Sequence, residues 1–105
     1  MSVGSDPINR CQIMGGDKLP AVSGGSATVC AEIERAIGAS APNVQYSIEV
    51  KVLSATRLAA SLMVDGHALP EQHFAIMDSE LDAGAIQRFA ASLARVVAQA
   101  ARAAK

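Results

Sequence analysis

The sequence predicts an α+β domain in which a helix, a meander of three antiparallel strands and a second helix follow one another. Apolar and polar residues alternate strictly over residues 46–52, and residues 58–64 repeat the pattern with Ala59, Ser61 and Met63 at the alternate positions. A period of two is typical of a strand with one buried face and one solvated face. Apolar residues recur at helical spacing on both sides of this region. We therefore expect an α-β-β-β-α order, with both helices packed on the single apolar face of the sheet.

The first helix is expected over residues 27–37. Ser26 precedes it as a candidate N-cap, and Gly38 is suited to end it in a left-handed conformation. Its apolar stripe consists of Val29, Ile33 and Ile37. This stripe is the surface that should face the sheet.

Turn signals divide the next segment into strands. The three strands are expected over residues 44–53, 57–64 and 69–77. Asp65 and Gly66 form a strong hairpin-turn pair, and Pro70 suits the start of a strand or an edge because it has no N–H to donate. The inward-facing residues are expected to be Tyr46, Ile48, Val50, Val52, Leu58, Ala60, Leu62, Val64, Phe74 and Ile76.

The second helix is expected from residue 82 or 83 to residue 101. Acidic residues around its start favour the positive end of the helix dipole, and its many alanines favour helix formation. Its apolar stripe consists of Ile86, Phe89, Ala90, Leu93, Val97 and Ala100. Arg88, Arg95 and Arg102 fall on the opposite side and predict a solvated face.

Length and composition restrict the class of protein. The 105 residues suit one domain, which we place at residues 11–105 after a flexible tail over residues 1–10. A net charge of −1 and 3% aromatic residues argue against a nucleic-acid partner, which normally meets a basic or aromatic surface. No apolar run approaches the length that a membrane span requires.

The two cysteines allow a disulfide. A bond between Cys11 and Cys30 would close a loop rich in glycine and would contribute about 3 kcal/mol on the loop-entropy argument. An even cysteine count in a small domain permits this in an oxidising compartment. The alternative is two unrelated thiols in a reducing cytosol, where Cys30 could also serve as a nucleophile.

The solvated face of the sheet is the strongest candidate for a functional surface. Its middle is small and mildly apolar, a character that can mark a protein interface. The candidate interface residues are Ala59, Ser61, Met63, His73, Ala75 and Met77. A face that simply meets solvent is the alternative, and a free edge strand is a second place for a partner.

His67, Glu71 and His73 suggest a different site. These side-chain types bind metal ions, and Glu71 and His73 share a face because they are two positions apart. A zinc site normally needs three or four converging ligands. We therefore expect no metal site, no cofactor and no catalytic residue, and we keep a cytosolic domain that binds a small ligand or metal as the alternative function.

Two resemblances add to this interpretation. The segments Cys11-x4-Gly16-Asp17-Lys18-Leu19-Pro20 and Gly24-Gly25-x4-Cys30 resemble small uncharacterised bacterial exported proteins. The order of elements is similar to that of the C-terminal domains of TonB and TolA, in architecture only. The resembled proteins have no assigned activity, so the expected function rests on the cysteine pair, the one-sided sheet with its mildly apolar outer face and the lack of a converging polar site. We expect a non-enzymatic periplasmic domain that binds a protein partner or forms a homodimer, with a cytoplasmic location as the alternative.

Overall fold

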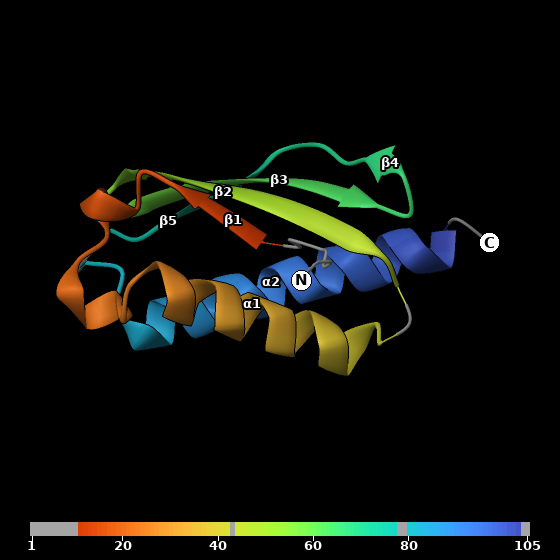
Figure 1. Ribbon diagram of the computed structural model, residues 1–105, viewed down its shortest axis with the longest axis horizontal. Coiled ribbons are helices and arrows are strands. Elements are labelled where there is room, and N and C mark those ends of the chain that lie inside the picture. Colours follow the sequence, from red (N-terminus) through yellow and green to blue (C-terminus); the bar gives the residue numbers. More distant parts are fainter. Residues whose placement is uncertain (1–10, 43, 78–79, 104–105) are drawn as a thin grey trace, which may run out of the picture.

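The protein folds into two layers, a β-sheet over a pair of helices (Figure 1). The computed structural model describes residues 11–42, 44–77 and 80–103, so the predicted flexible tail over residues 1–10 lies outside the described residues. Helices α1 (Ser26–Ser40) and α2 (Ala83–Ala103) lie side by side under the same face of the sheet. The α+β class and the placement of both helices are as the sequence predicts.

The sheet is mixed, so the prediction of a purely antiparallel three-stranded meander is wrong in this respect. Its strands are β1 (Cys11–Met14), β2 (Tyr46–Ser54), β3 (Arg57–Val64), β4 (His67–Ala68) and β5 (Gln72–Ala75). β2 and β3 pair antiparallel as predicted, whereas β1 pairs parallel with β2. The parallel pairing arises because helix α1 carries the chain back across the sheet between β1 and β2. Two short 3-10 helices, η2 (Gly16–Lys18) and η3 (Ala21–Ser23), connect β1 to α1.

The third predicted strand is shorter than expected, and a separate two-residue strand precedes it. β4 and β5 both pair with β3, at different positions along it. Pro70 lies between them and has no N–H for a sheet hydrogen bond. The N–H of Leu69 still donates to the carbonyl of Leu62 at 2.9 Å. The strand prediction over residues 69–77 is therefore correct in direction, since β5 pairs antiparallel with β3, but wrong in its bounds, because β5 spans only Gln72–Ala75 and β4 precedes the predicted range.

The predicted hairpin turn is confirmed. Asp65 and Gly66 both adopt positive φ angles, of 50° and 83°. Two consecutive left-handed residues are what a tight two-residue hairpin turn requires. Val64 and His67 pair directly across this turn, which fixes the register of β3 and β4.

The ends of helix α1 differ from the prediction. Gly25 occupies the N-cap position and Ser26 is the first helical residue, without a side-chain cap. At the other end the helix continues through Gly38 to Ser40, and the N–H of Ala41 donates to the carbonyl of Ile37. A glycine is tolerated inside an exposed turn of helix at a modest cost, so it does not by itself stop one.

A single hydrophobic core lies between the sheet and the helices. The predicted stripes are buried, and the ring centroids of Phe74 and Phe89 lie 5.4 Å apart across the two layers. Leu81, just before α2, is fully buried although the sequence pattern did not include it. The N–H of Leu81 donates to the carbonyl of Ala55, which fixes the start of α2 against the β2–β3 turn.

Candidate binding surface on the outer sheet face

The face of the sheet that points away from both helices is the candidate site, and we call it the outer face. Because side chains alternate along a strand, the residues between the core positions of β1, β2, β3 and β5 all lie on it. It comprises Gln12, Met14, Ser47, Glu49, Lys51, Arg57, Ala59, Ser61, Met63, His73 and Ala75. Among the described residues, no helix covers this face (Figure 1).

The strand register arranges these side chains in rows. One row runs from Gln12 through Glu49 to Ser61. The row beside it consists of Met14, Lys51, Ala59 and His73. The small Ser61 of β3 therefore lies beside the negative Glu49 of β2, and the small Ala59 lies beside the positive Lys51.

The six predicted interface residues fall into different environments. Met63 is 45% exposed, His73 and Ala75 are exposed, and Ser61 is partly buried. Ala59 lies in the middle of the outer face but is only 3% exposed, because the neighbouring side chains are larger. Met77 is 92% exposed and follows the end of β5. The contact area at the centre of the face therefore comes from the side chains around Ala59 rather than from Ala59 itself.

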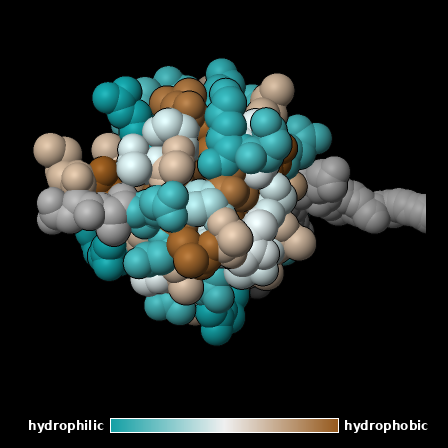
Figure 2. Space-filling view, turned by 90° about the vertical axis from the view of Figure 1, so that its left-hand side faces the viewer, coloured by the Kyte–Doolittle hydropathy of each residue, from teal (hydrophilic) through white to brown (hydrophobic). Residues whose placement is uncertain are grey.

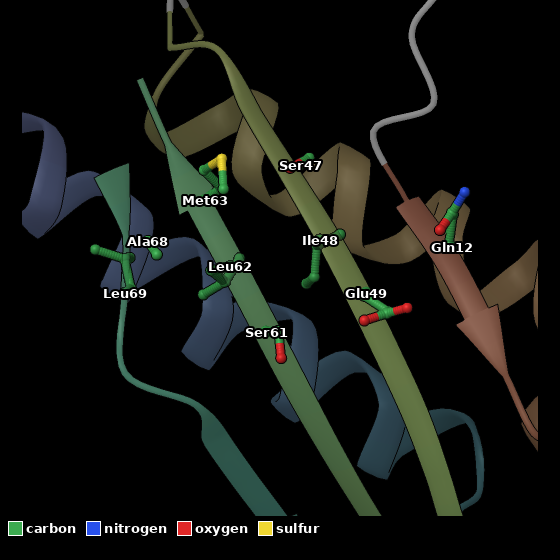
Figure 3. A pocket seen from close by; sticks show the side chains of 9 residues that line it. All are labelled: Gln12, Ser47, Ile48, Glu49, Ser61, Leu62, Met63, Ala68 and Leu69. Atoms are coloured by element: carbon green, nitrogen blue, oxygen red, sulfur yellow. The ribbon is translucent and has the colours of Figure 1, made fainter. Parts of the chain in front are cut away.

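Two shallow hollows flank this centre. The first has a volume of about 570 Å³ and includes Gln12, Glu49, Ser61 and Met63 in its lining (Figure 3). In Figure 3 these side chains come from three neighbouring strands, with the helices behind the sheet. The second hollow, of about 310 Å³, is lined by Leu53, Arg57, Leu58, His73, Phe74 and Ala75. The outer face is therefore an uneven surface that could receive protruding side chains.

The charges of the outer face are mostly unpaired. Glu32 forms an ion pair with Arg35 on α1, and the Oε1 of Glu71 lies 3.3 Å from the Nε2 of His73. Glu49 and Lys51 belong to neither of these pairs. These two opposite charges are therefore available to groups outside the described part of the chain.

The proposed ligand group of His67, Glu71 and His73 does not converge. His67 pairs with Val64 on β3, whereas His73 pairs with Ala59, five positions along the same strand. Five positions on a strand correspond to about 17 Å, and an odd offset puts the two side chains on opposite faces. Within the described ranges there is no group of three His, Cys, Asp or Glu residues that could hold a metal ion.

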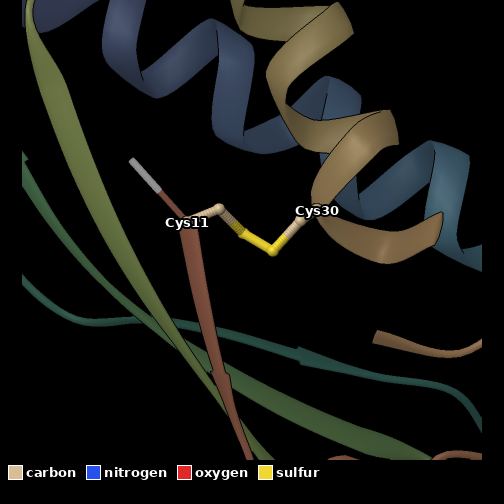
Figure 4. The surroundings of a disulfide bond; sticks show 2 residues. All are labelled: Cys11 and Cys30. Atoms are coloured by element: carbon tan, nitrogen blue, oxygen red, sulfur yellow. A yellow bond between two sulfur atoms is a disulfide. The ribbon is translucent and has the colours of Figure 1, made fainter. Parts of the chain in front are cut away.

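The two cysteines form a disulfide, as the sequence allows. The bond joins Cys11 of β1 to Cys30 of α1, with the Cα atoms 5.7 Å apart (Figure 4). Cys30 therefore offers no free thiol for catalysis in this structure. The bond crosses from the sheet layer to the helix layer and holds the edge strand against α1.

The end of the molecule that carries η2 and η3 has a different character. Figure 2 shows hydrophobic residues there in several separate groups among hydrophilic ones. Val22 of η3 is 57% exposed. Single exposed apolar side chains are common on protein surfaces, so this end is a weaker candidate than the outer face.

Sequence reasoning missed several residues of this region, among them Gln12, Met14 and Leu53. Gln12 and Met14 reach the outer face only because β1 joins the sheet, and Leu53 lines the second hollow at the irregularity between Val52 and Ser54. Because Val50 and Val52 are predicted to face inward, the same alternation assigns Lys51 and Leu53 to the outer side. Gln12 and Met14 also alternate with the inward-facing Cys11 and Ile13, but four residues are too short for a firm prediction.

Comparison of the chain with models of known protein families, with curated proteins and with solved structures found no match. Among the described residues, neither helix combines the length and the apolar character that crossing a membrane would need.

Proposed function

We propose that this protein is a small binding domain whose outer sheet face docks onto a protein partner. The observation that carries the proposal is the exposed apolar area of that face. Met14 of the edge strand β1 and Met63 of β3 are 50% and 45% exposed, and the small side chains of Ala59 and Ser61 lie low on the face beside Met63 on β3. Methionine side chains adapt to the shape of a partner and are common on binding surfaces.

The chemistry of this area supports binding rather than catalysis. Its side chains offer methyl, hydroxyl and thioether groups, which contribute contact area and single hydrogen bonds. Glu49 and Lys51 lie beside them on β2, and Arg57 lies on β3. Exposed apolar side chains mixed with charged and hydroxyl groups are a common composition of protein interfaces.

We also propose that the protein acts in the bacterial cell envelope, in the periplasm. The disulfide between Cys11 and Cys30 supports this, because such bonds persist in oxidising compartments. Trapping thiols by alkylation in intact cells tests this location. Blocked cysteines that become reactive only after reduction are expected, whereas two reactive thiols in the untreated cells would overturn it.

A site-specific photo-cross-linker tests the binding surface. Introduced in place of Met63, it is expected to form an adduct with a protein in cells. The same group in place of Gln99, which is exposed on α2, is the matched control and should form no such adduct. The adduct should also disappear when Ser61→Arg fills the centre of the face. Equal adducts from both positions, or an adduct that survives Ser61→Arg, would contradict the proposal.

A further inference from the structure

We infer that the partner of the outer face is a second copy of this chain, related by a two-fold axis that runs across the strands. This inference rests on the proposed function, since it names the occupant of the same surface. It starts from Glu49 and Lys51, which are consecutive outer-face residues of the central strand β2. Neither forms an ion pair with another described residue. They lie about 7 Å apart along the strand.

A two-fold axis can make the charges of Glu49 and Lys51 in one copy complementary to the same charges in a second copy. An axis in the plane of the interface, perpendicular to the strands and level with Val50, reverses the order of residues along each strand. Strand β2 of one copy then lies over β2 of the other in the opposite direction, and β3 lies over β3 in the same way. Glu49 of each copy consequently faces Lys51 of the other, and two identical ion pairs form. Such a self-complementary contact is what a two-fold dimer requires.

The neighbouring strand fits the same axis. On β3 the axis is level with Ala60, so Ala59 of one copy faces Ser61 of the other. Both side chains are small and lie low on the face, so the two sheets can approach to about the 10 Å at which stacked sheets pack. One row further out, Met63 covers the aliphatic stem of Arg57 from the second copy.

Two other two-fold arrangements do not pair Glu49 of one copy with Lys51 of the other. An axis along β2 would place Glu49 on Glu49 and Lys51 on Lys51, which repel. An axis between β2 and β3 would place Glu49 over Ser61 and Lys51 over Ala59. Both charges would then lose water without gaining a counter-charge, at a considerable cost. Of these arrangements, the axis across the strands is the one that pairs both charges.

Charge reversal tests this arrangement by sedimentation of the purified full chain. The wild type should show twice its mass of 10.8 kDa. Glu49→Lys and Lys51→Glu should each raise the dimer dissociation constant on the order of tenfold or more, since each creates two repulsive pairs. An equimolar mixture of these two variants should dimerise again, and so should the double variant. Glu34→Lys, on the exposed side of α1, is the matched control and should leave the dimer unchanged.

Each other outcome overturns the inference. A wild type that stays monomeric at every concentration excludes a second copy, and single variants as dimeric as the wild type exclude this face. Single variants that are monomeric but fail to associate when mixed exclude this axis, provided that circular dichroism of each variant matches that of the folded wild type. A monomeric wild type whose Met63 cross-linker still captures a protein in a Ser61-dependent way leaves the proposed function standing. A monomeric wild type whose Met63 cross-linker captures no protein would contradict both the inference and the proposed function.

Discussion

The Cα atoms of Cys11 and Cys30 lie 5.7 Å apart, and the bond between these residues connects the edge strand β1 to helix α1. The two cysteines are separated by 19 positions in the sequence. A cross-link that closes a loop of this length restricts the unfolded chain and stabilises the fold by about 3 kcal/mol.

The double variant Cys11→Ser/Cys30→Ser is therefore expected to lower the free energy of unfolding by about 3 kcal/mol. Urea unfolding followed by circular dichroism measures this difference. Mass spectrometry after alkylation provides the control, since the wild type should gain no label before reduction and two labels after it. A double variant as stable as the wild type would show that the cross-link does not constrain the unfolded chain.

Gly15 should tolerate no side chain. Its φ angle is 74°, and a Cβ there would lie 2.8 Å from the carbonyl oxygen of Val52. Gly15→Ala is expected to cost about 1–2 kcal/mol from the backbone conformation alone, and more from the clash. Gly38→Ala is the matched control, because Gly38 lies in helix α1 with open space around it. The free energy of unfolding of Gly38→Ala should rise by about 0.5–1 kcal/mol. In thermal unfolding, Gly15→Ala should lower the melting temperature and Gly38→Ala should raise it. A Gly15→Ala variant as stable as the wild type would be inconsistent with the described path of the chain.

Asp82 caps helix α2. Its Oδ1 accepts a hydrogen bond of 2.9 Å from the N–H of Ala85. Asp82→Ala should lower the free energy of unfolding by about 1 kcal/mol, because that N–H loses its acceptor. Asp82→Asn keeps a side-chain oxygen at the same position, so its free energy of unfolding should fall by much less. If both variants were equally destabilised, the hydrogen bond would not be the cause.

Phe89 is the largest fully buried side chain, and it contacts Phe74 across the layers. Phe89→Ala is expected to cost about 3–5 kcal/mol, since it removes buried apolar area and leaves a cavity. Ser92→Ala, at an exposed position of the same helix, should change stability by less than about 0.5 kcal/mol. Chemical unfolding of both variants checks the prediction, and a loss at Phe89 as small as that at Ser92 would argue against this packing.

Much of the fold could be predicted from local patterns. Alternation located β2 and β3, the Asp65–Gly66 pair located the hairpin turn between β3 and β4, and helical spacing located the buried faces of α1 and α2. These features depend on residues close in sequence. The parallel pairing of β1 depends instead on how α1 crosses the sheet, and four residues carry too little pattern to reveal a distant partner.

The candidate site was predictable to a similar extent. Strand alternation identified which side of β2 and β3 would face outward. It could not show that Ala59 lies below its neighbours, because burial on an outer face depends on the size of side chains on adjacent strands. It also could not separate β4 from β5, since Pro70 is compatible both with the start of a strand and with a break in one.

The edges of the sheet have a consequence of their own. Among the described strands, the long β2 and β3 lie inside the sheet, while the edges consist of β1, β4 and β5, each of four residues or fewer. Long, flat edge strands recruit further chains and start amyloid-like fibres. Short edges, one held by a disulfide and the other interrupted by proline, offer a poor template for such growth. The sheet can therefore leave its outer face uncovered while its edges resist open-ended strand addition.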